Sequence, residues 1–404
     1  MTRFINTMST PTRFAILLAF LFACPPAHVE GQPGRAVVDE TALSRLRGAA
    51  EAAHSDAVVV WKDGREVAEW YFGGRPERLA AMSMTKSVVS LAIGRLVTTH
   101  AISSIDDPVF KYYPEWRQGR KQEITLRHLL NHTSGLQDPG NSSDVEQSPD
   151  AIRLALAAEL ADPPGTRFFY NNKAVNLLSG VIQKVSGKRM DLYVRDELFA
   201  PLGITDVSWE LDSAGNAFAY AGLAIRPVDL AKLGQLVLDR GRWGGRQLIA
   251  PEWFDDALRA GPLSERCGLL WWLVPERTTW IIDDSRLDTL RRAGVDSAFL
   301  RRATAIRGRY ASLEGYTAAL QRAFGPRYWE PVETALAPAR VRGLGRTEYG
   351  RMIGYEASGY LGQYLVIYPE YRLVAVRMVK PSERSNSDTD SFETFSDLVR
   401  ALVR

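Results

Sequence analysis

The sequence predicts an α/β protein of the α+β type, in which both ends of the chain contribute strands to one antiparallel sheet. Segments 57–74 and 364–379 each contain two β-rich runs joined by a short turn, so we expect a hairpin near either end. Between them, apolar residues recur mostly at helical spacing. This order favours a sheet flanked by helices, with a cleft between the sheet and a helical middle part.

Composition is typical of a globular protein. The chain has 404 residues, of which 46% are hydrophobic and 24% charged, which is enough for a large core. The formal net charge is +3, and the basic residues are scattered along the chain. We therefore expect no nucleic-acid partner, because such a partner needs a basic patch or stripe.

Residues 1–27 have the three-part pattern of an export signal. A polar start with basic residues precedes the apolar run Phe14 to Ala23, and small residues and prolines follow. The run is too short to span a bilayer permanently. Processing is expected either near Ala27 or at a bacterial lipoprotein site where Cys24 becomes lipidated. We expect an exported protein, periplasmic or lipid-anchored to the bacterial envelope, with no internal disulfide because Cys267 is the only other cysteine.

The first elements after the signal are a predicted helix over 39–53 and the hairpin over 57–74. Asp63-Gly64 joins the two runs of this hairpin. Asp-Gly between alternating apolar residues is the strongest short-range hairpin signal, because both central positions of the tight turn need a positive φ.

The segment "SMTKSVVSLAIGRLV", which begins at Ser83, is predicted to be a buried helix, because its apolar residues lie on most sides. Ser83 and Lys86 are one helical turn apart and face the same way. An isolated charge in an apolar interior is costly, so Lys86 must find a partner or shift its pKa. The pair is either an N-cap with a solvated lysine or a nucleophile beside its base.

Two more stretches accompany this pair: "LRHLLNHTSGL" (126–136) and "PGTRFFYNN" (164–172). Together the three motifs resemble the serine β-lactamase and penicillin-binding-protein superfamily. The branch that they resemble most includes class C β-lactamases, D-aminopeptidases, DD-carboxypeptidases and many esterases. The resemblance implies a β-lactamase-like hydrolase domain over 36–404, with an all-helical subdomain over about 98–255.

The resemblance also implies roles for Ser83, Lys86, Tyr170 and Asn172. A serine hydroxyl is a weak nucleophile until an unprotonated neighbour removes its proton. Burial and the positive end of the helix both lower the pKa of Lys86, which would make it that neighbour. Tyr170 would handle protons across the cleft, as a phenolate favoured by nearby cationic charge, and Asn172 would orient Lys86 or the substrate amide. An acyl-enzyme is the expected intermediate.

The third motif departs from the family pattern. Relatives carry Lys-Thr-Gly or His-x-Gly on a strand that lines the cleft, whereas this chain has Ala357-Ser358-Gly359. Ser358 and Gly359 are expected to bind substrate, and the N–H groups of Tyr360 and Ser83 to form an oxyanion hole. The missing cation removes the usual partner of a penicillin or peptidoglycan carboxylate, so we expect weak or no β-lactamase activity.

Arg346 and Arg351 are the alternatives for binding such a carboxylate. The first lies at the end of an insertion over about 275–346, which is rich in arginine and is predicted to form two or three amphipathic helices. The insertion either forms a lid or wall at the cleft or packs on the surface, and its basic face also fits an anionic membrane.

The predicted function is a serine hydrolase that acts through an acyl-enzyme on a small ester, amide or peptide, of the esterase, DD-peptidase or D-aminopeptidase type. The alternative is a non-catalytic protein of the same fold that binds components of the cell envelope. No cofactor or metal is expected. His128 and His132 have i, i+4 spacing, but no glutamate stands between them in a zinc-protease pattern.

Overall fold

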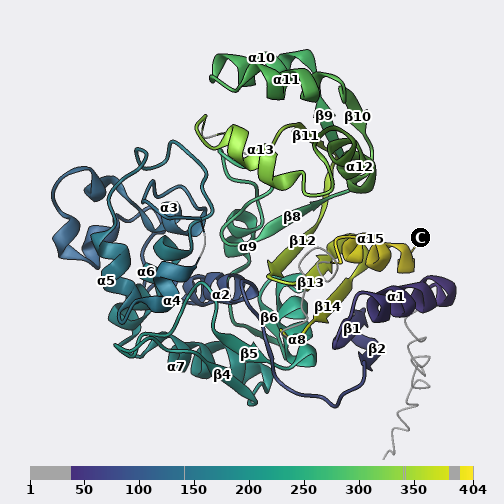
Figure 1. The fold of residues 1–404 in the computed structure, drawn as a ribbon. Coiled ribbons are helices and arrows are strands. Elements are labelled where there is room, and N and C mark those ends of the chain that lie inside the picture. The colour runs from purple at the N-terminus through teal and green to yellow at the C-terminus, as the bar shows by residue number, and fades with distance from the viewer. Residues whose placement is uncertain (1–37, 141, 340, 342, 382–391, 404) are drawn as a thin grey trace, which may run out of the picture. The chain divides into compact units, whose positions relative to one another are not determined.

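Strands from both ends of the chain meet in one six-stranded sheet, as predicted (Figure 1). The strand order is β2-β1-β14-β13-β12-β8, and every neighbouring pair is antiparallel. The strands are β1 (Ala57–Lys62), β2 (Arg65–Tyr71), β8 (Trp272–Pro275), β12 (Met352–Gly359), β13 (Gln363–Tyr368) and β14 (Leu373–Met378). The two predicted hairpins are therefore neighbours in space, because β1 pairs with β14 along its whole length.

This computed structural model describes residues 38–403 apart from 141, 340, 342 and 382–391. The expected export signal, with Cys24, lies outside the described residues. No helix in the described part of the chain is long and apolar enough to cross a membrane.

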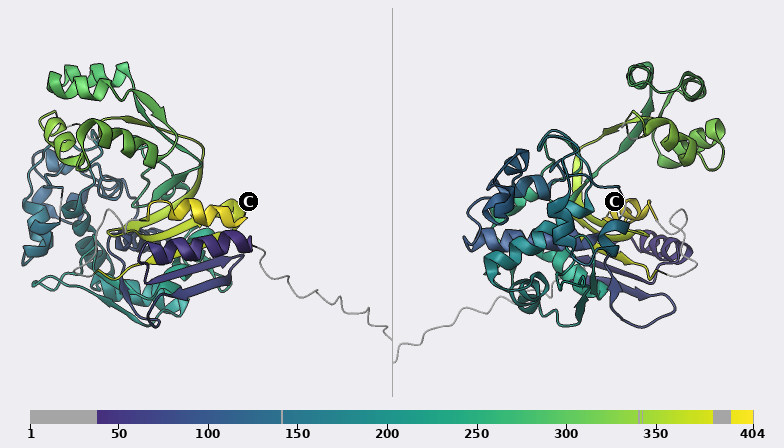
Figure 2. Two further views of the ribbon diagram at one scale, coloured as in Figure 1. Left: turned by 45° about the vertical axis from the view of Figure 1, so that its right-hand side comes forward. Right: turned by 60° about the vertical axis from the view of Figure 1, so that its left-hand side comes forward.

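The β1–β2 turn has the predicted geometry, since φ is +54° at Asp63 and +73° at Gly64. Alternate residues of the strands point to opposite faces of the sheet. Val58 and Val60 pack on one face with α1 (Glu40–Ala52) and α15 (Phe395–Arg400). Val59 lies on the other face, over α8 (Pro227–Leu238) and α2 (Met84–Thr98). Figure 2 shows α1 and α15 side by side over the strands.

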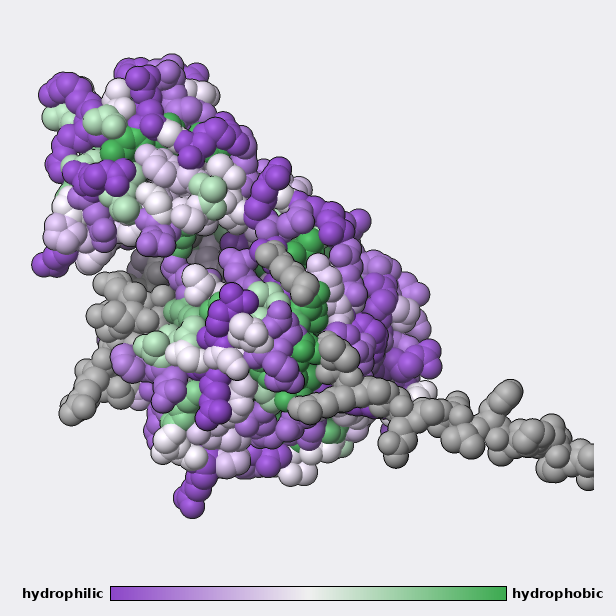
Figure 3. Space-filling view, turned by 90° about the vertical axis from the view of Figure 1, so that its right-hand side faces the viewer, coloured by the Kyte–Doolittle hydropathy of each residue, from purple (hydrophilic) through white to green (hydrophobic). Residues whose placement is uncertain are grey.

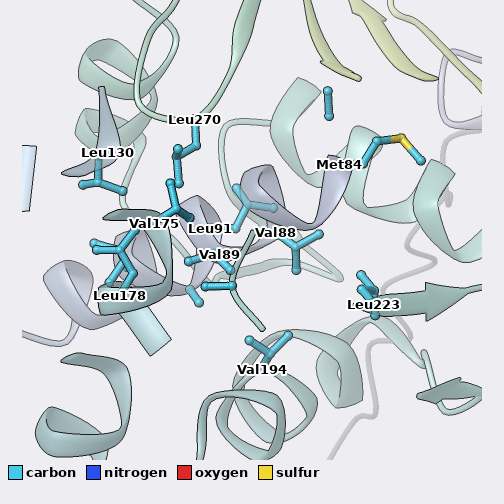
Figure 4. Close-up of a cluster of buried hydrophobic side chains, with 14 of the residues drawn as sticks. Met84, Val88, Val89, Leu91, Leu130, Val175, Leu178, Val194, Leu223 and Leu270 are labelled. Carbon is cyan, nitrogen blue, oxygen red and sulfur yellow. The ribbon is translucent and has the colours of Figure 1, made fainter. Parts of the chain in front are cut away.

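Helix α2 runs through the larger of these cores. Twelve of its residues are buried, so it is enclosed on most sides, as its composition predicted. Figure 4 shows side chains from other parts of the chain around it, including Leu130, Val175, Leu223 and Leu270. Its N-terminus points at β12 and so places the Ser83 segment beside the sheet.

The middle of the chain supplies most of the remaining helices. These are α3 (Leu126–Leu130), α4 (Ser143–Gln147), α5 (Ala151–Ala157), α6 (Asn172–Ser186), α7 (Met190–Val194) and α9 (Pro251–Ala257). The segment 98–255 is not all-helical as expected, because it also holds β4 (Val207–Trp209), β5 (Leu223–Ile225), β6 (Arg242–Trp243) and β7 (Arg246–Gln247). Strands this short pair through tertiary contacts, here of β5 with β4 and with β3 (Leu79–Ala80), and leave no alternating pattern in the sequence.

The insertion, which we call the inserted lobe (residues 275–346), has more structure than predicted. Its described residues contain four helices and two strands, and a third strand begins at its last residue. These elements are α10 (Asp284–Arg292), α11 (Ser297–Thr304), α12 (Leu313–Phe324), α13 (Trp329–Leu336), β9 (Thr278–Ile282), β10 (Gly308–Tyr310) and β11 (Arg346–Tyr349). They enclose a separate apolar core, and the lobe surface drawn in Figure 3 is mostly hydrophilic. Strands β9 and β11 extend the pairing of β8 with β12, so the lobe is joined to the sheet by one two-stranded ribbon (Figure 2).

Candidate active site

Ser83 lies in the short turn between β3 and α2. The turn is fixed by the Ala81 N–H, which donates to the Leu223 carbonyl over 2.8 Å, and Met82 adopts the left-handed region at φ +48°. Ser83 occupies the N-cap position of α2, but its side chain makes no capping hydrogen bond. Its Oγ lies 2.8 Å from Lys86 Nζ instead. The alternative that Ser83 serves only as an N-cap therefore does not account for the position of its hydroxyl group.

Lys86 is buried, with 3% of its surface exposed, so it does not extend into solvent. Its Nζ also donates to the Tyr220 carbonyl over 2.7 Å, and it lies 4.8 Å from the ring centre of Tyr170. Burial lowers the pKa of Lys86 well below its usual value, and the charge of Asp138 acts in the opposite direction. The ε-amine is thus biased toward the neutral form that a base requires.

Tyr170 faces Lys86 across the site, but as a phenol. Burial raises the pKa of Tyr170 to about 12, although a hydrogen bond with Ser83 acts in the opposite direction. The expectation of a phenolate at neutral pH is therefore wrong, because desolvation of the buried hydroxyl outweighs the nearby amine, which is itself biased toward neutrality. Tyr170 can donate or relay a proton at neutral pH.

His132 holds the Tyr170 segment in place. Its Nδ1 accepts from the Asn171 N–H over 3.2 Å, and its ring lies 4.5 Å from that of Tyr170. Burial lowers the pKa of His132 to about 3, so the ring is neutral and can accept this bond. His128 is used elsewhere, since it forms a capping box with Thr125. Among the described residues no cluster of three or more His, Cys, Asp or Glu side chains is arranged to hold a metal.

Asn172 does not take the predicted position. It is the first residue of α6, it does not line the cavity at Ser83, and its buried Oδ1 has no hydrogen-bond partner among the described residues. The neighbouring Asn171 caps α6 through the Ala174 N–H. Lys86 is oriented by the Tyr220 carbonyl instead, a contact between residues 134 positions apart that no local pattern in the sequence marks.

Gly359, at the end of β12, packs closely against the Ser83 turn. A Cβ on Gly359 would lie 2.8 Å from the Ala81 carbonyl oxygen and 3.0 Å from Met82 Cβ, so only glycine fits. The end of β12 therefore lies against the turn that precedes α2. The oxyanion hole formed by the N–H groups of Tyr360 and Ser83 stays a prediction. The bend after β12 is held by the buried guanidinium of Arg377, which donates to the carbonyls of Leu361 and Gly362 over 2.7 and 2.8 Å.

A cavity of about 550 Å³ opens beside Ser83. Five aromatic side chains and one carboxyl group line it, together with small and apolar residues. The lining residues are Ser83, Gly140, Phe168, Tyr170, Trp272, Glu356, Ser358, Gly359, Tyr360, Leu361, Gly362 and Tyr364. The inserted lobe contributes none of them, so among the described residues it forms no wall of this cavity.

No lysine or arginine is among these lining residues of the described chain. Arg346 is paired with Asp283 over 2.8 Å and Glu348 over 2.6 Å, and Arg351 with Glu370 over 2.6 Å. Neither arginine lines the cavity, so neither replaces the cationic side chain that relatives carry at the position of Ala357. The Ala357 side chain is buried in the larger core.

Glu356 is the lining residue with a carboxyl group, and it is among those that the sequence analysis missed. Burial raises the pKa of its carboxyl group, while the charge of Arg266 and a hydrogen bond from Ser396 act in the opposite direction. The signal was available in the sequence, because residues 356 and 358 of a strand point to the same face. What the strand pattern could not show is that this face opens into the cavity.

The chain is also similar to known proteins. Residues 42–392 match the Beta-lactamase family. The chain is 24% identical over 241 residues to the 6-aminohexanoate-dimer hydrolase of Paenarthrobacter ureafaciens, covering 55% of this chain and 61% of that protein. It is 30% identical over 158 residues to esterase EstB of Burkholderia gladioli, covering 33% of this chain and 40% of that protein. The alignments thus span less than two thirds of these relatives.

Solved structures share the fold at low identity. A penicillin-binding protein homologue from Caulobacter crescentus superposes with a TM-score of 0.58 at 17% identity, covering 91% of this chain and 99% of that one. The octameric penicillin-binding protein homologue from Pyrococcus abyssi gives a TM-score of 0.55 at 19% identity, covering 87% and 76%. These similarities confirm the predicted β-lactamase-like fold.

Proposed function

Because the chain belongs to the Beta-lactamase family, we propose that it is a serine hydrolase that forms an acyl-enzyme on Ser83 with a small ester or amide. The observation that carries this proposal is the 2.8 Å contact of Ser83 Oγ with a buried lysine amine whose pKa is lowered. Burying a lysine reduces the stability of the folded protein, and residues with such perturbed pKa values cluster at functional sites. Here the neutral amine can act as the base that deprotonates the Ser83 hydroxyl.

In the proposed reaction, Lys86 Nζ takes the Ser83 proton as Oγ attacks the carbonyl carbon. The negative charge that develops on the carbonyl oxygen is met by the backbone N–H groups of Ser83 and Tyr360. The Tyr170 phenol passes a proton to the leaving group and recovers it from the amine. In the second half of the reaction, Tyr170 and Lys86 remove a proton from a water molecule as it attacks the acyl carbonyl, and Lys86 returns a proton to Ser83 Oγ as the acid is released.

The relatives support an ester or amide substrate. The names of two of them state hydrolysis of an aminohexanoate dimer and an esterase activity. The cavity described here has no cation for a β-lactam carboxylate, so we propose weak or no β-lactamase activity for this chain.

The direct test is covalent labelling with a fluorophosphonate probe, followed by peptide mapping, together with hydrolysis of p-nitrophenyl esters. We expect the label on Ser83, and Ser83→Ala to remove both labelling and hydrolysis. Ser90→Ala is the matched control, because Ser90 lies on the same helix, is buried, has no hydrogen-bond partner among the residues that the structure describes, and does not line the cavity. Hydrolysis that survives in Ser83→Ala, or folded wild-type protein that takes up no label, would contradict the proposal.

A further inference from the structure

The cavity beside Ser83 has one ionisable carboxyl group among its described lining residues, and its geometry points to the substrate. Glu356 and Ser358 lie on the same face of β12, about 7 Å apart along the strand. Both line the cavity that Ser83 opens into. The carboxyl group therefore lies within reach of a substrate whose carbonyl is at Ser83.

One oxygen of Glu356 is already used, and the other is not. Ser396 Oγ donates to Oε2 over 2.9 Å. Oε1 accepts no hydrogen bond from any residue in the described part of the chain. This oxygen is also not fully buried, so part of its surface is accessible. Oε1 is therefore available to accept a hydrogen bond from a group bound in the cavity that Glu356 lines, while Ser396 holds the other oxygen.

The cationic side chain whose charge acts on Glu356 forms no ion pair with it in the described part of the chain. Arg266 acts on Glu356 through its charge, but its Nε donates to the Leu273 carbonyl over 3.0 Å and its guanidinium lies over the ring of Tyr349 at 5.6 Å. The described residues contain no ion pair between Arg266 and Glu356. Lys86 faces the adjoining small cavity and is biased toward its neutral form.

Aromatic faces complete the surroundings of Glu356. Trp272 is its cross-strand partner on β8 and stacks on Tyr170 with 6.1 Å between ring centres. Tyr364 pairs with Ser358 across β12 and β13 on the same face. Burial favours the neutral form of this carboxyl group, and an ammonium group beside it would favour the ionised form instead. The ionised group and the faces of the rings are both negative, so together they attract an ammonium group and reject an anion.

We propose that Glu356 binds an ammonium group of the substrate, so that the enzyme selects esters or amides that carry a primary amine several bonds from the scissile carbonyl and discriminates against anionic substrates. This inference rests on the proposed function. Relatives that carry Lys-Thr-Gly or His-x-Gly at this place have a cation that favours anionic substrates. In this chain Ala357 is neutral and the charged residue of β12 is the acid Glu356, so we expect the opposite preference, for cationic substrates.

The test uses small inhibitors, so that it does not depend on which half of the substrate carries the amine. Hexylammonium, hexanoate and 1-hexanol are compared as competitive inhibitors of p-nitrophenyl acetate hydrolysis at pH 7.5. For the wild type we expect the inhibition constant of hexylammonium to be at least tenfold lower than that of hexanoate. In Glu356→Gln this ratio should fall to within about threefold of one, whatever the effect of the change on turnover.

Glu370→Gln is the matched control, since Glu370 is an exposed acid in the turn between β13 and β14 that does not line the cavity, and it should keep the wild-type ratio. If Glu356→Gln does not fold, Glu356→Ser removes the same charge with less volume. A wild type without the ammonium preference, or a charge-free variant that retains it, would overturn the inference.

Titration calorimetry of hexylammonium into Ser83→Ala separates this inference from the proposed function. Binding that is lost on adding Glu356→Gln supports the role of Glu356 even where no hydrolysis is detected. Binding that is unchanged by Glu356→Gln contradicts that role even where Ser83 is the nucleophile.

Discussion

At the scale of single residues, the protonation state of Lys86 determines the chemistry. Its usual pKa lies near 10.5, and burial moves it well below that value. A neutral amine is required, so kcat/KM should rise with pH through the folded-state pKa of Lys86 and reach its plateau below pH 10.5. Because the pKa of Tyr170 is about 12, its ionisation should cause no alkaline decline below that pH.

Asp138 offers a way to move this profile. Its charge favours the ammonium form of Lys86, so Asp138→Asn should lower the pKa of Lys86 further and shift the acidic limb of the kcat/KM profile to lower pH. Asp144→Asn, which removes a nearby acid paired with Lys173, should leave the limb in place. A profile of Asp138→Asn that is unchanged, or shifted to higher pH, would show that the limb does not report on Lys86.

At the scale of elements, the alignment of β12 with the start of α2 sets the oxyanion hole. Gly359→Ala places a methyl group 2.8 Å from the Ala81 carbonyl oxygen, so the strand must move away from the Ser83 turn. A misplacement of about 1 Å in a catalytic site lowers activity by roughly 10²-fold, and we expect a loss of that order in ester hydrolysis.

The control for this strand variant is Gly48→Ala in α1. A Cβ at Gly48 meets nothing within 4 Å, and alanine in a helix interior is more favourable by about 1 kcal/mol. Gly48→Ala should therefore keep full activity and raise the melting temperature. Unchanged hydrolysis in a folded Gly359→Ala variant would mean that the approach of β12 does not position the reacting groups.

At the scale of the whole molecule, the inserted lobe has its own core and leaves the cavity to the rest of the chain. The two strands of the ribbon that connects the lobe to the sheet are paired at Glu276 and Arg351, where the Glu276 N–H donates to the Arg351 carbonyl over 2.8 Å. The lobe can be removed at this pair. Replacing Arg277–Gly350 by Asn-Gly should turn this pair into the end of a two-residue hairpin. We expect the shortened protein to fold and to label at Ser83 with the fluorophosphonate probe.

The outcome of this replacement distinguishes two roles of the lobe. Labelling at the wild-type rate places the lobe outside the chemical step, as the cavity lining suggests. A shortened protein that is folded by circular dichroism but no longer labels would show that the lobe completes the site, as a lid would.

The sequence by itself determined the elements whose cause is local. Asp63-Gly64 required a turn with positive φ, the apolar residues around Lys86 required burial of their helix, and the motifs at Ser83 and Tyr170 indicated the family. Tertiary structure decided whatever depends on contacts between distant segments. The Tyr220 carbonyl at Lys86, the phenol state of Tyr170 and the opening of Glu356 into the cavity depend on neighbours far away in the chain, and a hydrogen bond or a desolvated group leaves no periodic pattern in sequence.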